Sequence, residues 1–106
     1  MPATLVLAYP RGAEVDLAYY TGKHLAIALP ALKQAGLKSW RVSKAAAGDH
    51  EVIVFLEFDS LASIAALSAP GTEASRNAAA EDLPNYSKLP PVRWVVEEIA
   101  SEVLVG

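Results

Sequence analysis

The chain has 106 residues, of which 53% are hydrophobic and 20% are charged, and its net charge at pH 7 is -3. This composition excludes an intrinsically disordered chain, and the length predicts a single domain over residues 1–106. The Lys and Arg residues are scattered, so we expect no nucleic-acid partner. The absence of cysteine excludes disulfides, zinc–thiolate sites and thiol nucleophiles.

The first apolar segment bears on where the protein acts. Ala3–Tyr9 has no basic start and is followed directly by Pro10-Arg11-Gly12. It is too short for the apolar region of a signal peptide with its flanks, and too short to span a bilayer. We therefore expect a cytoplasmic protein with no membrane partner.

Apolar runs and the turn residues between them predict the following elements in chain order. They are a strand at Thr4–Tyr9, a helix at Asp16–Ala35, a strand at Leu37–Lys44, a turn at Ala45–His50, a strand at Glu51–Asp59, a helix at Ser60–Ala69, a further helical piece at Thr72–Asp82, a loop at Leu83–Pro91 and a long strand at Val92–Val105.

Single residues mark the predicted helix boundaries. Asp16 and Ser60 are residue types that cap helix N-termini, and Gly36 is typical of a helix C-terminus. Pro30 lies inside the first helix, where it removes one backbone donor. We therefore expect that helix to kink or split near Leu29.

The predicted order is βαββαβ, which is the order of the ferredoxin-like plait, an α+β fold. Its sheet is antiparallel, and both helices pack on one face. The third strand nevertheless has apolar side chains on both faces, including Val54 and Leu56 on one and Ile53 and Phe55 on the other. Because monomers rarely expose so large an apolar face, we expect a homodimer packed sheet to sheet. The alternative is a C-terminal tail folded over that face.

The first predicted helix carries the side chain best suited to proton transfer. On a helical wheel at about 100° per residue, His24 falls in the apolar arc near Leu17, whereas Tyr19 falls on the outer face. Tyr20 lies one turn before His24, so the two side chains can meet. His24 is therefore a candidate general base or acid, with Tyr20 beside it. The alternative is a core histidine satisfied by a backbone carbonyl or by Tyr20.

The segment Asp82–Ser87 precedes the last predicted strand and should lie at one end of the sheet. Asn85 and Tyr86, in a loop stiffened by proline, are candidate ligand contacts at the lip of a pocket. The alternative for Asn85 is a hydrogen bond to local backbone in a turn. Tyr9 and Trp40 are further candidate ligand contacts, although a tryptophan on a strand is more often a core or interface residue.

Several chemistries are not indicated by the sequence. Two histidines without acidic residues at ligand spacing do not suggest a metal, so we expect no metal site. Neither a glycine-rich phosphate loop nor a Gly-x-Ser-x-Gly nucleophile motif is present. We expect no cofactor, and we expect His50 to be solvated in its turn.

Four short motifs occur in order along nearly the whole chain. They are Tyr9-Pro10-Arg11 followed by Asp16-Leu17-Ala18-Tyr19-Tyr20-Thr21-Gly22-Lys23-His24-Leu25, then Gly36-Leu37 with Trp40, then Phe58-Asp59-Ser60-Leu61, and finally Asp82-Leu83-Pro84-Asn85-Tyr86-Ser87. The first resembles the Asp-x-x-Tyr-Tyr-x-x-x-His opening of the EthD family, named after ethyl tert-butyl ether degradation. The last resembles that family's Asp-x-Pro-Asn-aromatic-Thr segment. One departure is Ala26, where many members have proline.

The resemblance implies a dimeric α+β barrel with a small apolar ligand between sheet and helices, and it favours a functional His24. Related families include monooxygenases, dehydratases and cyclases. The first hypothesis is a cofactor-free enzyme acting on a hydrophobic or phenolic compound, in which His24 moves a proton. Tyr20 or Tyr86 then holds the developing oxyanion, with help from Asn85.

Two further hypotheses stay open. The second is an accessory or carrier protein that binds the same kind of compound without turnover. The third is a haem-binding protein with His24 as the axial ligand.

Overall fold

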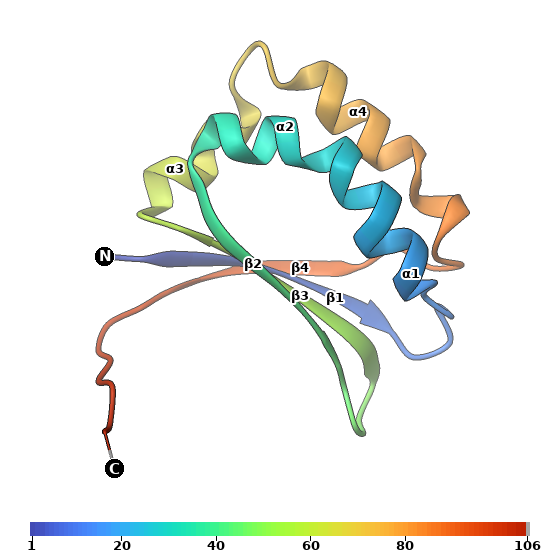
Figure 1. Cartoon of the computed structure of the whole chain (residues 1–106), viewed down its shortest axis with the longest axis horizontal. Coiled ribbons are helices and arrows are strands. Elements are labelled where there is room, and N and C mark those ends of the chain that lie inside the picture. Colours follow the sequence, from blue (N-terminus) through green and yellow to red (C-terminus); the bar gives the residue numbers. More distant parts are fainter. Residues whose placement is uncertain (106) are drawn as a thin grey trace.

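The computed structural model describes residues 1–105 as one sheet covered on one face by helices (Figure 1). The strands are β1 (Ala3–Pro10), β2 (Leu37–Lys44), β3 (His50–Phe58) and β4 (Val92–Glu97). The helical segments are α1 (Leu17–Tyr19), the π-helical turn η1 (Tyr20–His24), α2 (Leu25–Ala35), α3 (Leu61–Ala65), the 3-10 turn η2 (Ala66–Ser68), α4 (Glu73–Glu81) and the 3-10 turn η3 (Leu83–Asn85).

The strands lie in the order β2-β3-β1-β4, and each neighbouring pair is antiparallel. In Figure 1, α2 and α4 lie side by side over the same face of the sheet. Within residues 1–105 no helix covers the other face. The predicted ferredoxin-like βαββαβ plait, and with it the α+β class, is confirmed.

The helix boundaries follow the predicted signals. The Asp16 carboxylate accepts a hydrogen bond from the Tyr19 N–H at 3.0 Å, and the Ser60 hydroxyl accepts one from Ser63 N–H at 3.3 Å. Gly36 ends α2 with φ of 101°, a conformation that strains any residue with a side chain. None of the helices in residues 1–105 is long and apolar enough to cross a membrane.

The helix does not split near Pro30, which was one of the two predicted outcomes. The helix α2 continues across Pro30, and the irregular turn is η1, where the Leu25 N–H bonds the Tyr20 carbonyl. Pro30 and Ala26 are both exposed, so water can bond the Ala26 carbonyl that Pro30 leaves without a donor.

The last strand is shorter than predicted. Only Val92–Glu97 is β-structure, because β1 begins at Ala3, which pairs with Glu97, and offers no residues to pair beyond it. The last bond to the sheet runs from the Glu98 N–H to the Pro2 carbonyl at 2.9 Å. The following residues to 105 leave the sheet (Figure 1), and their large apolar side chains are 82–97% exposed. This tail therefore does not cover the open face.

The two faces of the sheet differ in burial. On the helix-covered face, Leu5, Leu56 and Phe58 are at most 4% exposed. On the open face, Trp94 and Val96 of the edge strand β4 are 42% and 46% exposed. The open face thus presents apolar side chains that residues 1–105 of a single chain leave uncovered.

Candidate functional site

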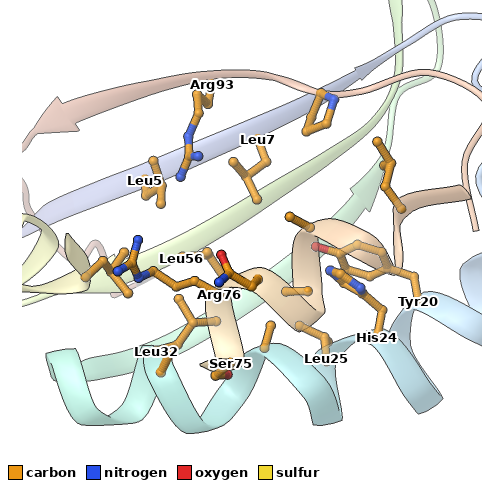
Figure 2. Close-up of a pocket in the computed structure, with 18 of the residues that line it drawn as sticks. Leu5, Leu7, Tyr20, His24, Leu25, Leu32, Leu56, Ser75, Arg76 and Arg93 are labelled. Carbon is orange, nitrogen blue, oxygen red and sulfur yellow. The ribbon is translucent and has the colours of Figure 1, made fainter. Parts of the chain in front are cut away.

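A cavity of about 520 Å³ lies between the sheet and the helices, within the usual range of about 300–1,000 Å³ for small-molecule sites. Its walls come from β1, β3 and β4 on one side and from η1, α2 and α4 on the other (Figure 2). Leucine and alanine side chains make up much of the lining. The polar lining residues are Tyr9, Tyr20, His24, Ser68, Ser75, Arg76, Asn77, Tyr86 and Arg93.

The imidazole of His24 and the carboxylate of Asp82 form a buried pair at this cavity. His24 Nδ1 lies 3.0 Å from Asp82 Oδ2, and both residues are 6% exposed. The other ring nitrogen, Nε2, has no hydrogen-bond partner within residues 1–105. In that part of the chain, every side-chain nitrogen or oxygen that is fully buried has a hydrogen-bond partner. Nε2 has no partner and so is not fully buried. Because His24 lines the cavity, Nε2 is accessible from it.

Asp82 is held by side chains on several sides. Tyr19 Oη donates to Oδ1 at 2.7 Å, and Asn85 Nδ2 donates to the same oxygen at 2.9 Å. Burial alone would raise the pKa of Asp82, but the hydrogen bonds from Asn85, Tyr19 and His24 outweigh burial and lower that pKa below its ordinary 3.8. Asp82 is therefore a carboxylate near neutral pH, and it can stabilise a proton arriving on His24.

Two tyrosine rings flank the imidazole, and the ring of Tyr9 packs against both of them. The ring centroids of Tyr20 and Tyr86 lie 4.9 Å and 4.3 Å from that of His24. The hydroxyls of Tyr9 and Tyr86 share a hydrogen bond of 2.8 Å. Burial raises the pKa of Tyr9, Tyr20 and Tyr86, so all three phenols keep their protons and can act only as neutral donors or acceptors.

Loop contacts hold this site together. The Asp16 N–H donates to the Tyr86 carbonyl at 2.8 Å, and the Lys88 N–H donates to the Ala13 carbonyl at 2.8 Å. These bonds tie the segment after α4 to the segment before α1. The two segments that supply His24 and Asp82, far apart in sequence, are thereby fixed side by side.

The structure brings together most of the predicted site residues. His24, Tyr20, Tyr9 and Tyr86 all line the cavity. Asn85 does not line it and instead bonds the carboxylate of Asp82.

Trp40 also lies outside the cavity lining. It belongs to β2, an edge strand separated from β1 by β3, and its side chain is 43% exposed.

Three contributions were missed from the sequence. Tyr19, expected on the outer face, turns its hydroxyl to Asp82, because η1 departs from the 3.6-residue period that the wheel assumed. In the sequence Asp82 stands out only as part of its motif, and no pattern marks the two arginines of the cavity, Arg76 and Arg93. The motif at 82–87 was the one available pointer to the partner of His24.

Among residues 1–105, no group of three or more His, Cys, Asp or Glu side chains is placed to hold a metal ion. An imidazole beside a carboxylate, as in the pair of His24 and Asp82, is suited to proton transfer.

Comparison with known proteins shows which solved structures have a similar fold. No protein-family model matches the chain, and no curated protein matches it. Among solved structures, an EthD-like protein from Ralstonia eutropha JMP134 is 23% identical with a TM-score of 0.68, over 95% of both chains. An EthD-family protein from Bacillus halodurans C-125 is 15% identical with a TM-score of 0.66, over 93% of this chain and 100% of that one.

A third match is SnoaB, a cofactor-independent oxygenase from Streptomyces nogalater. It is 13% identical with a TM-score of 0.64, over 94% of this chain and 95% of that one. The chain thus has the fold of these EthD-like proteins and of SnoaB.

Proposed function

We propose that the cavity binds a small hydrophobic or phenolic compound and that His24 transfers protons to and from it without a cofactor. The observation that carries the proposal is the geometry of His24. Its Nδ1 is held by a buried carboxylate, while its Nε2 is open to an otherwise largely apolar cavity. This is the arrangement that keeps one imidazole nitrogen free to accept a proton.

The step begins with the neutral ring protonated on Nδ1, which donates to Asp82 Oδ2. Nε2 then takes a proton from an acidic C–H or O–H bond of the ligand, and the ligand keeps the electron pair as an enolate or phenolate. The Asp82 carboxylate stabilises the imidazolium so formed. Returning a proton to the same carbon completes an exchange, and returning it to another carbon completes an isomerisation. In an elimination of water, the proton goes to a departing hydroxyl, whose C–O bond breaks as the C=C bond forms.

The ligand anion needs a hydrogen-bond donor near His24. Tyr20 is the best placed, because its ring contacts that of His24 and Figure 2 shows the two residues side by side on the same cavity wall. Burial keeps the pKa of Tyr20 above its ordinary value, so its hydroxyl carries a proton to donate. A donor of this kind in a site shielded from water favours the charged state over the neutral ligand.

Deuterium exchange of 2-tetralone in D2O, followed by proton NMR, tests this proposal. The compound is an apolar bicyclic ketone with an acidic C–H next to its carbonyl. We expect the protein to accelerate exchange at that carbon, and His24→Gln to lose about 10²–10⁴-fold of the acceleration. His50→Gln, the matched control, should exchange at the normal rate. Equal rates for His24→Gln and the unaltered protein would refute a proton-transfer role for His24.

The same experiment separates the enzyme from a carrier. A carrier would bind 2-tetralone, as measured by calorimetry, without accelerating exchange above the buffer rate. The haem alternative has its own readout, which is a Soret band that forms on adding haemin and is lost in His24→Gln.

The proposal includes a homodimer formed through the open sheet face. Trp94 and Val96 supply the exposed apolar surface there, and the extended tail covers none of it. Trp94→Glu should shift the mass measured by light scattering from dimer to monomer. Trp40→Glu is a matched control, because Trp40 is equally exposed but shares the helix-covered side with its pairing partner Leu56. A monomeric unaltered protein would contradict the dimer.

A further inference from the structure

Two arginines stand out in the cavity lining. Apart from His24, Arg76 on α4 and Arg93 on β4 are the charged residues that line it, and no Asp or Glu does so. Neither guanidinium forms a salt bridge within residues 1–105. The chain as a whole is acidic, with a net charge of -3, so an unbalanced pair of positive charges in its main cavity is a local exception.

The two arginines line the cavity from opposite walls, Arg93 from the sheet and Arg76 from the helices. Arg93 pairs with Leu7 in the register of β1 and β4, and Leu7 is itself a cavity residue. Arg76 is anchored on one side only, because its Nε donates to the Thr72 hydroxyl at 2.8 Å. That bond orients the guanidinium and leaves its two terminal nitrogens available to a ligand.

The arginines lie away from the proton-transfer groups. Figure 2 shows Arg76 and Arg93 toward one end of the cavity and Tyr20 and His24 toward the other. Arg76 precedes Asp82 by six residues, which corresponds to about 9 Å of rise along a helix. A ligand that meets both ends must therefore be elongated, with a polar group at each end and an apolar body between them.

From these positions we infer that the ligand of this cavity is a carboxylic acid, whose carboxylate binds Arg76 and Arg93 while its opposite end meets His24. A planar guanidinium with free terminal nitrogens matches a carboxylate and is more weakly hydrated than a lysine ammonium. The apolar lining between the two ends, which includes Leu7, favours an aromatic or alicyclic body (Figure 2). The carboxylate site at the arginines does not depend on the proposed function. Only the statement that the opposite end of the ligand meets His24 rests on it.

The test compares two fluorescent probes that differ by one charge. They are 6-hydroxy-2-naphthoic acid, which has a carboxylate at one end and a phenol at the other, and its methyl ester, which is neutral. We expect the unaltered protein to bind the acid at least about tenfold more tightly than the ester. The double variant Arg76→Gln/Arg93→Gln should reduce that ratio to about one.

Control variants show whether the effect depends on where the positive charges lie or only on their number. Lys33→Gln/Lys38→Gln removes two positive charges from exposed residues outside the lining and should keep the full ratio. His24→Gln should also keep it, because the carboxylate lies at the other end. Arg76→Lys, which keeps the charge without the planar fork, should retain part of the preference for the acid and shows whether loss in the double variant reflects misfolding.

The outcomes distinguish failure of the carboxylate inference from failure of the proposed catalysis. Equal binding of acid and ester by the unaltered protein, or an unchanged ratio in the arginine double variant, overturns the carboxylate inference alone. A preserved preference for the acid with no proton exchange of 2-tetralone overturns the proposed catalysis alone. If neither probe binds at millimolar concentration, both the ligand site and the inference are overturned.

Discussion

Glu51 and Asp82 are two carboxylates that each accept three hydrogen bonds, and they differ in what donates those bonds. Glu51, near the start of β3, accepts from backbone N–H groups of Gly12, Glu14 and Val15 at 2.9–3.1 Å. Asp82, directly after α4, accepts from three side chains at 2.7–3.0 Å, one of which is His24. In both cases burial raises the pKa, and the hydrogen bonds more than offset burial and lower it.

The difference shows that hydrogen bonds to a carboxylate can either hold a loop or orient a titratable side chain. Backbone donors fix the path of the chain whatever the donating residues are, so Glu51 fastens the loop that leads into α1. Side-chain donors depend on residue identity, and His24 can also exchange its proton. The Asp82 cluster therefore orients a titratable ring at a cavity, whereas the Glu51 cluster holds a loop. Three isosteric substitutions distinguish these roles.

The largest effect is expected from Asp82→Asn. The Asn85 and Tyr19 hydrogen bonds both go to Oδ1, which asparagine keeps, so only Oδ2 changes, from an acceptor to an NH2 donor. That donor forces His24 Nδ1 to accept, and the ring proton moves to Nε2, which can no longer act as a base. We expect 2-tetralone exchange to fall by about 10²–10⁴-fold, with little change in melting temperature. Retention of full exchange would show that Asp82 does not set the tautomer.

Glu51→Gln should affect stability and leave exchange unchanged. Glutamine turns an NH2 group toward the Val15 N–H, so one backbone donor loses its acceptor. For a partly exposed and solvent-screened group we expect a loss of about 1 kcal/mol, or a melting temperature lower by about 4–8 °C. Reduced exchange at a temperature where the variant is folded would contradict the separation of the two carboxylates.

The pH dependence of the Glu51→Gln effect has a defined sign. The pKa of Glu51 is lower in the folded chain than its ordinary 4.5, so its stabilising contribution is fully present above pH 4.5. The contribution is lost as the pH falls through the folded-state pKa. Denaturant titrations should therefore give the full stability difference at pH 7 and a shrinking difference below pH 4.5. A difference that stays constant to low pH would exclude the ionised carboxylate as its source.

The smallest effect is expected from Tyr19→Phe. It removes one donor to Asp82 and leaves those from His24 and Asn85 in place. The pKa of Asp82, followed by NMR of its carboxyl carbon, should rise toward 3.8, and exchange should fall by no more than about threefold. An effect as large as that of Asp82→Asn would mean that Tyr19 itself contacts the reacting ligand.

Much of the site could be predicted because its signals are local. The helical period alone placed His24 on the buried side of its helix and Tyr20 beside it, since residues four apart in a helix are neighbours whatever the rest of the chain does. Trp40 could not be judged in the same way, because its strand pattern does not reveal that β2 is an edge strand separated from β1 by β3.

The amino-acid sequence by itself determined the order of strands and helices, the caps at Asp16 and Ser60, and an apolar face too extensive for the helices to cover. Each of these depends on residues close together in the chain. The tertiary structure alone decided that His24 meets Asp82, 58 residues away, and that β4 ends at Glu97 where β1 has no more residues to pair. Such contacts depend on how separate elements pack, and the local periodicity of the sequence contains no information about that packing.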